Sequence, residues 1–266
     1  MIRDITIGQY YQGESVIHRL DPRTKILATL AYIVCLFVLK TFWGLGGAAL
    51  VLAAVIAISK VPLSFILRGL RPIFFIIMLT FILNMFMFSG EVLVKVWIFT
   101  ITKEGLTKAV FMAARLILLI LGSSMMTLTT KPIELTDGIE SLLSPLRKIG
   151  VPAHELAMMM SIALRFIPTL LEETDKIMKA QQARGADFET GNIFRRAKSM
   201  LPILIPLFVS AFRIAQDMAM AMEARCYHGG EGRTRMNKMK YEKRDAVAAI
   251  LTVMFIAAAV LERIFM

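Results

Sequence analysis

Two segments of the sequence share the spacing Ala-x-x-Ala-Arg, each followed by one more small residue. The first lies within KAQQARGADFE and runs from Ala180 to Gly185; the second lies within MAMEARCYHGG and runs from Ala221 to Cys226. Alanines one helical turn apart leave room for another helix or a groove wall to approach closely. The arginine that follows offers a planar fork of N–H donors, which suits carboxylates and carbonyl oxygens. The repeat predicts contact with a partner that has two similar grooves, such as a dimer of ATPases.

Helix capping explains the same residues without a partner. Gly185 can adopt the left-handed conformation that ends many helices, and Arg184 in the last turn would complement the helix dipole. Cys226 adopts that conformation less readily than glycine, yet the Ala-x-x-Ala-Arg frame precedes it too. The repetition favours docking over capping alone.

Other chemistry-bearing patterns do not occur in the sequence. No glycine precedes a lysine, so the phosphate-binding loop G-x-x-x-x-G-K-[ST] is absent. His18, His154 and His228 have no metal partner at a suitable spacing, and HELAMMM is not HExxH because Met158 takes the last position. The two cysteines lie far apart and define no disulfide framework. We therefore expect a non-catalytic protein with no metal and no cofactor.

Composition predicts an integral membrane protein. The chain is 57% hydrophobic with a mean hydropathy of +0.65, and its apolar runs approach the roughly 20 residues that a bilayer requires. The lysines and arginines that give the chain its net charge of +11 lie mostly between these runs, which indicates a signal for membrane topology rather than nucleic-acid binding. The N-terminus shows no removable signal peptide. The five predicted crossings are residues 25–41, 48–59, 72–88, 106–128 and 246–266.

The segments that join the crossings carry further expectations. We expect a glycine turn at Gly44, Gly46 and Gly47, and a basic loop that holds Lys60, Arg68 and Arg71. The stretch VLVKVWIFTITKEG is short and partly alternating, which favours a loop or ribbon. Within the fourth crossing, Arg115 could mark a transport pathway or could face neighbouring helices near the membrane boundary.

A long charged insert separates the fourth crossing from the fifth. Its periodicity predicts helices at about 132–149, 153–184 and 193–224, with a bend near Pro168. The apolar cores of the last two are short and contain Arg165 or prolines, so we expect them to lie along the membrane rather than cross it. If each crossed, their basic connection would lie outside, against the positive-inside tendency. Both helices begin apolar and end charged, so their ends should point away from the bilayer.

The predicted fold is an all-α integral membrane protein with about five transmembrane helices and a cytoplasmic module of three helices, two of them long. The predicted domains are an N-terminal transmembrane domain at 1–130, the helical module at 131–243 and a C-terminal transmembrane helix at 244–266.

The sequence resembles the transmembrane T component of energy-coupling factor (ECF) transporters over nearly its whole length. The resemblance is most specific from TKPIELTDGIESLLSPLRKIG through QQARGADF and at MAMEARCY, and HRLDPRTKI resembles the family's opening. It implies a subunit of a bacterial or archaeal cell-membrane importer, with its N-terminus and helical module cytoplasmic. The implied partners are the lipid bilayer, two ABC-type ATPases and a substrate-capturing S component for a vitamin or transition-metal ion. The cargo itself is not specified by this chain.

The resemblance also implies roles for particular residues. The ATPase-docking motifs would be Ala183, Arg184 and Gly185, and Ala224, Arg225 and Cys226, with cysteine where the family usually has glycine. The apolar halves of the long helices would cradle the S component. The residues expected at that contact are Met158, Met159, Leu164, Leu204 and Phe208. Methionines there could fill a core or form an adaptable surface. A membrane-anchored scaffold for another cytosolic partner and a stand-alone transporter remain the alternatives.

Overall fold

The computed structural model describes residues 10–87, 91–96, 99–188, 192–229 and 239–265. The described parts of Gly8–Gly138 and Lys238–Met266 form one compact unit, which we call the bundle unit. Those of Ile139–Asn237 form a second, the helix-pair unit. Each is described by itself below.

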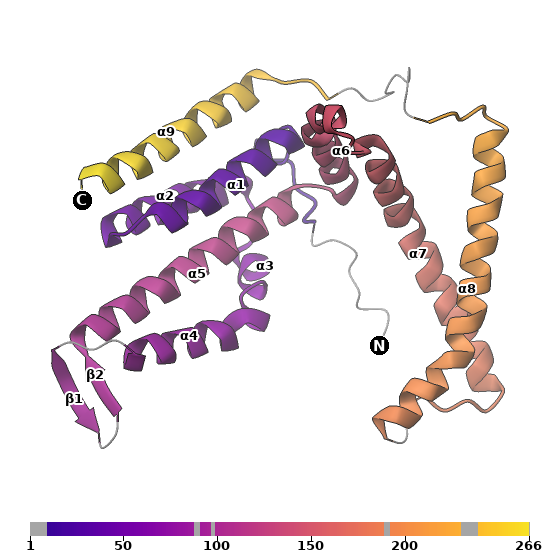
Figure 1. Ribbon diagram of the computed structural model, residues 1–266, viewed down its shortest axis with the longest axis horizontal. Coiled ribbons are helices and arrows are strands. Elements are labelled where there is room, and N and C mark those ends of the chain that lie inside the picture. The colour runs from indigo at the N-terminus through magenta and orange to yellow at the C-terminus, as the bar shows by residue number, and fades with distance from the viewer. Residues whose placement is uncertain (1–9, 88–90, 97–98, 189–191, 230–238, 266) are drawn as a thin grey trace. The chain divides into compact units, whose positions relative to one another are not determined.

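The bundle unit contains most of the elements drawn in Figure 1: α1 (Pro22–Val38), α2 (Phe42–Ser59), α3 (Leu63–Arg68), η2 (Arg71–Ile73), α4 (Phe74–Met87), β1 (Val92–Val96), β2 (Phe99–Thr102), α5 (Lys103–Thr129) and α9 (Lys243–Phe265). Helix α6 (Pro132–Leu143) begins in this unit and ends in the helix-pair unit. The helix-pair unit continues with η3 (Ser144–Ile149), α7 (Ala153–Ala183) and α8 (Ile193–Glu223).

The first helix begins at a capping aspartate followed by a proline. The Asp21 carboxylate accepts a hydrogen bond from the backbone N–H of Arg23 at 2.9 Å, and Pro22 occupies the first helical position. A capping carboxylate and a proline that needs no N–H partner both favour a helix start.

The glycine turn predicted before the second crossing is wrong, because α2 begins at Phe42 and includes all three glycines. Thr41 caps this helix: its backbone is extended, and its hydroxyl accepts a hydrogen bond from the N–H of Gly44 at 3.2 Å. Glycine is tolerated in transmembrane helices more than in soluble ones. The cap therefore decides where the helix starts, and the glycines do not end it.

The segments between the later crossings are more ordered than a loop. Part of the predicted basic loop folds into α3, which buries Ile66 to 1% exposure. Of the loop and the ribbon that the sequence left open after the third crossing, the structure has a ribbon: β1 and β2 pair antiparallel with Val92 opposite Thr102. This hairpin is the connection between α4 and α5 (Figure 1).

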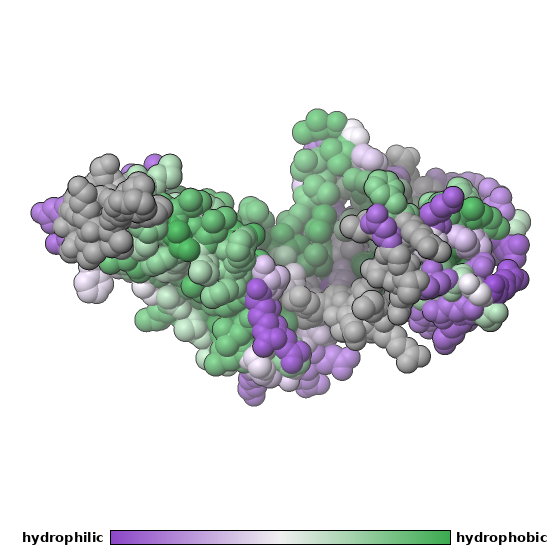
Figure 2. All heavy atoms as spheres, turned by 90° about the horizontal axis from the view of Figure 1, so that it is seen from below, coloured by the Kyte–Doolittle hydropathy of each residue, from purple (hydrophilic) through white to green (hydrophobic). Residues whose placement is uncertain are grey.

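The core of the bundle unit lies where α5 packs against α1, α2 and α4, and where α9 packs against α1 (Figure 1). Leu36 is fully buried at 0% exposure, and Leu128 is 2% exposed. Apolar side chains also face outward, including Phe74 and Phe75 of α4. Apolar residues (green) cover much of the left-hand part of the visible face in Figure 2. A helix that is apolar both inside and outside fits a lipid environment.

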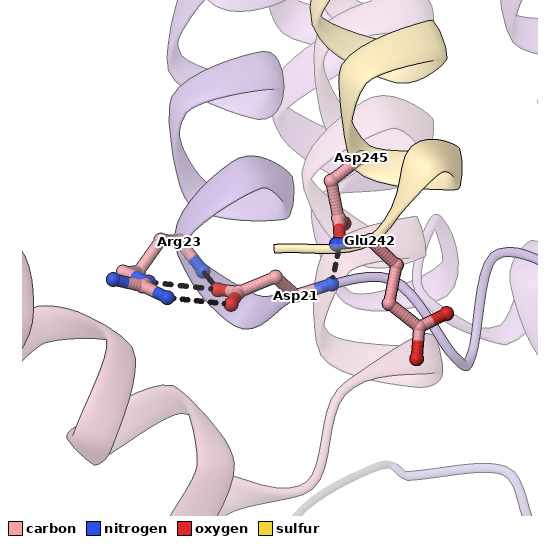
Figure 3. A network of polar contacts seen from close by, with 4 residues as sticks. All are labelled: Asp21, Arg23, Glu242 and Asp245. Carbon is pink, nitrogen blue, oxygen red and sulfur yellow. Dashed lines mark hydrogen bonds and ion pairs between the residues drawn. The ribbon is translucent and has the colours of Figure 1, made fainter. Parts of the chain in front are cut away.

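A polar anchor joins α9 to the start of α1 (Figure 3). The Asp245 side chain, in the first turn of α9, is buried at 4% exposure. It accepts one hydrogen bond from the N–H of Asp21 at 2.8 Å and another from the N–H of Glu242, also at 2.8 Å. Asp21 in turn pairs with Arg23 at 2.8 Å. One buried carboxylate thus satisfies backbone donors from two distant parts of the chain.

Arg115 packs against a neighbouring helix. Its Nη2 donates a hydrogen bond to the carbonyl of Leu39 at 2.6 Å, and its guanidinium lies 4.7 Å from the centre of the Phe111 ring. Leu39 follows the last residue of α1, where a cation complements the helix dipole. Of the two alternatives for Arg115, this contact favours packing against helices.

The helices of the insert have the predicted bounds to within one residue. The first is divided into α6 and η3, which together span 132–149, and α7 and α8 end one residue before the predicted positions. α8 changes direction in its N-terminal half (Figure 1), the half that contains Pro202 and Pro206. Proline removes a backbone donor and bends a helix at such a place.

In the described part of the chain, six helical stretches are long and apolar enough to cross a membrane. They are Phe42–Ser59, Leu63–Met87, Lys103–Thr129, Ala153–Ala183, Lys198–Glu223 and Lys243–Phe265. Helix α1, predicted to cross, has 17 residues, the lower limit for a span. The α7 and α8 stretches are the least hydropathic of the six. Their position along the membrane rather than across it stays a prediction.

Candidate docking ends of the two long helices

The C-terminal end of α7 adopts a specific hydrogen-bonded cap. Gly185 has a left-handed backbone with φ of +88°, and its N–H donates to the carbonyl of Gln182 at 2.9 Å. The N–H of Ala186 reaches back to the carbonyl of Gln181 at 3.0 Å. These two bonds define a Schellman cap. Arg184 is the last residue before the left-handed position.

The C-terminal end of α8 adopts the same cap around a cysteine. Cys226 has a left-handed backbone with φ of 56°, and its N–H donates to the carbonyl of Glu223 at 2.8 Å. The N–H of Tyr227 donates to the carbonyl of Met222 at 3.1 Å. The hydrogen bonds keep cysteine in the conformation that glycine adopts in α7. The two ends therefore share backbone geometry as well as sequence.

Both ends are open to contact. Each of the six predicted docking residues is exposed: Ala183, Arg184, Gly185, Ala224, Arg225 and Cys226. The chain's own backbone satisfies the caps, so neither guanidinium is needed to complete them. Each arginine can thus present its donors to carboxylates or carbonyl oxygens of another molecule.

The two ends lie far apart within the helix-pair unit. The side chain of Gln181, near the end of α7, donates to the carbonyl of Pro202, near the start of α8, at 3.4 Å. From that contact α8 runs away from the end of α7 (Figure 1). At a rise of 1.5 Å per residue, Arg225 lies about 35 Å along α8 from Pro202. The repeated motif therefore offers two separate contacts rather than one combined surface.

The residues predicted to meet an S component lie on the apolar parts of the same helices. Met159, Leu204 and Phe208 are exposed to 55%, 48% and 57%, whereas Met158 and Leu164 are half-buried. Ile203 is the buried apolar side chain that α8 contributes among those the structure describes. An apolar face this open needs lipid or a protein partner to cover it.

The sequence did not indicate one polar pair that connects α6 to α7. The Nδ1 of His154 lies 3.1 Å from a carboxylate oxygen of Glu140. The histidine is half-buried. No spacing rule links residues fourteen positions apart across η3. Only the fold brings them together.

Comparison with known proteins shows the family to which the chain belongs. Residues 13–236 match the CbiQ family, described as cobalt transport protein. The chain is 58% identical over 262 residues to the energy-coupling factor transporter transmembrane protein EcfT of Thermosediminibacter oceani, covering 98% of this chain and 99% of that one. It is 55% identical over 267 residues to EcfT of Clostridium kluyveri, covering 100% and 99%.

A relative in Bacillus subtilis, also described as EcfT, is 45% identical over 259 residues and covers 97% of each chain. The chain belongs to the EcfT family. The predicted resemblance is confirmed, and so is the all-α membrane fold. As an EcfT-family protein, the chain is a multi-pass transmembrane component of an ECF transporter. The relatives' descriptions name neither the residues of α7 and α8 that act in the transporter nor the proteins they meet.

Proposed function

We propose that this EcfT-family chain couples two cytoplasmic ABC-type ATPases to an S component that captures a vitamin or a transition-metal ion. The observation that carries this proposal is the pair of matching, exposed arginine caps at the ends of α7 and α8. The ATPases would hydrolyse ATP, and the chain itself would be non-catalytic. The S component would choose the cargo.

The two caps suggest how motion would pass through the chain. Arg184 and Arg225 would each enter a groove of one ATPase, and closure of the ATPase pair would change the distance between the two grooves. Because helices move as packed units rather than deforming smoothly, α7 and α8 would carry that change to their apolar halves. Those halves would cradle the S component through Met158, Met159, Leu164, Leu204 and Phe208.

This proposal includes an orientation. Residues 131–243 and the N-terminus would face the cytoplasm, and 1–130 and 244–266 would hold the membrane spans. The exposed thiol of Cys226 tests it, since Cys35 is buried in the bundle core. When the chain is expressed without the ATPases, whose groove would cover Cys226, a membrane-impermeant maleimide should label it in inside-out vesicles and not in intact cells. Cys226→Ser should abolish the labelling. Labelling of intact cells would refute this orientation.

Charge reversal tests the docking role. The double variant Arg184→Glu/Arg225→Glu should lose the ATPases from a mild-detergent pull-down while the chain still inserts into the membrane. Arg165→Glu/Arg213→Glu is the matched control, because these arginines are also exposed on α7 and α8 but lie away from the caps. Normal ATPase recovery with the double variant would overturn the proposal. Recovery of another cytosolic protein instead would favour an anchored scaffold, and transport by the isolated chain in liposomes would favour a stand-alone carrier.

A further inference from the structure

An apolar groove runs between α2 and α9 on the bundle unit. Its volume is about 510 Å³. One wall contains Gly47 and Val51 of α2, the other contains Met254 and Ala258 of α9, and Leu39 also lines it. Helix α1 packs against both α2 and α9. Both walls belong to stretches long and apolar enough to cross a membrane, so the groove belongs to the lipid-facing part of the chain.

One end of the groove is polar. The hydroxyl of Thr41 donates a hydrogen bond to the carboxylate of Glu262, and the same hydroxyl accepts from the N–H of Gly44. Glu262 thus lies at the N-terminus of α2, where the helix dipole favours negative charge. Trp43 stands beside it at 86% exposure, as aromatic residues do where a membrane meets water.

The Glu262 carboxylate retains capacity to accept further hydrogen bonds. A carboxylate offers about four acceptor positions. Within the described residues, the hydrogen bond from Thr41 is the one that reaches this side chain. A cationic group at this end of the groove would therefore gain both a hydrogen bond and an opposite charge.

We propose that the groove binds one phospholipid with an ammonium headgroup. An acyl chain would lie along Gly47, Val51, Met254 and Ala258, and the headgroup ammonium would contact Glu262. Charge complementarity favours an ammonium headgroup over an anionic one, because an anionic headgroup would place its negative charge next to the Glu262 carboxylate. The groove would select zwitterionic lipids such as phosphatidylethanolamine over phosphatidylglycerol.

A transmembrane helix from a partner fits the groove less well. Close helix packing on α2 would use its small residues, which let backbones approach. The side chain of Glu262 lies directly against Gly44, so that a Cβ placed on this glycine would overlap the carboxylate. A partner helix would have to displace the Thr41–Glu262 contact, whereas a lipid headgroup uses it.

Two glycines give a matched test of the groove. A Cβ placed on Gly46 or on Gly47 meets no atom within 4 Å, so either position accepts a larger side chain without a clash. Gly47 lines the groove, whereas Gly46 does not. Gly47→Leu should therefore fill the groove, and Gly46→Leu is its control. Glu262→Gln removes the charge but keeps a carbonyl to accept from Thr41.

The experiment is native mass spectrometry of the purified full-length chain in an equal mixture of phosphatidylethanolamine and phosphatidylglycerol with identical acyl chains. We expect the wild type and Gly46→Leu to retain one phosphatidylethanolamine and Gly47→Leu to lose it. Glu262→Gln should reduce the preference over phosphatidylglycerol by up to about fivefold, the range of a partly exposed ion pair. Equal retention of both lipids by the wild type would overturn the headgroup assignment. Retention of the lipid by Gly47→Leu would overturn the lipid site. So would the loss from this variant of a co-purifying membrane protein rather than of a lipid.

Discussion

The bundle unit and the helix-pair unit differ in how many of their apolar side chains they bury. The bundle unit has a core of its own around Leu36 and Leu128, closed at one end by the buried carboxylate of Asp245. α7 and α8 are each 31 residues long, yet between them they bury few apolar side chains within the described chain. The first unit has a buried apolar core of its own, whereas the second leaves most of its apolar side chains exposed or half-buried.

The largest expected effect comes from testing this contrast in the isolated chain. Leu36→Ala removes a fully buried side chain and should lower the free energy of unfolding by about 2–5 kcal/mol. Phe208→Ala, at a side chain 57% exposed on α8, should change it by less than about 0.5 kcal/mol. Denaturation in mixed detergent micelles measures both. An equal loss for the two variants would mean that the helix-pair unit has a core of its own.

The sequence predicts local features of the fold but not contacts between distant residues. The bounds of α7 and α8 follow from helical periodicity and from local caps, so they were predicted to within one residue. The start of α2 was not, because glycines within an apolar run resemble a turn, and the capping role of Thr41 outweighs them. Contacts between distant residues, such as Asp245 with Asp21 or His154 with Glu140, have no signal in a single sequence.

The candidate docking ends of α7 and α8 also combine features that the sequence predicts with features that it does not. The repeated Ala-x-x-Ala-Arg frame identified both helix ends, since the motif and the cap are local features. Their separation depends on where α7 packs against α8, which the motif does not encode. The left-handed conformation of Cys226 was likewise uncertain from sequence, because cysteine rarely adopts it.

A smaller effect concerns the ion pairs of the two units, whose contributions to stability should depend differently on pH. In the bundle unit, burial would raise the pKa of Asp21, but the hydrogen bonds and charge of Arg23 outweigh it and hold that pKa below its usual value. Because the folded-state pKa is lowered, this stabilisation is complete above about pH 4 and is lost as pH falls through the folded pKa. Arg23→Gln should therefore lower the melting temperature at pH 6 and progressively less in more acidic buffers.

Lys176→Gln is the matched control for that measurement. Lys176 pairs with Glu173 at 3.8 Å on the surface of α7, with 72% of the lysine side chain exposed. Exposed pairs of this kind contribute about 0–1 kcal/mol. Its substitution should leave the melting temperature nearly unchanged at every pH. A pH-independent loss in Arg23→Gln would show that Arg23 acts through its contact with the Tyr241 ring, 4.1 Å away, rather than through Asp21.

The smallest effect distinguishes the two helix ends from each other. A left-handed residue other than glycine is disfavoured by roughly 1 kcal/mol. Cys226→Gly should therefore stabilise the end of α8 by about that amount, and Gly185→Cys should weaken the end of α7 equally, since both positions are exposed and left-handed. Hydrogen–deuterium exchange of the last turn of each helix measures this: slower exchange at Met222 and Glu223 in the first variant, and faster exchange at Gln181 and Gln182 in the second. If the swap leaves both ends unchanged, the caps are held by their hydrogen bonds alone, and the cysteine does not destabilise the end of α8.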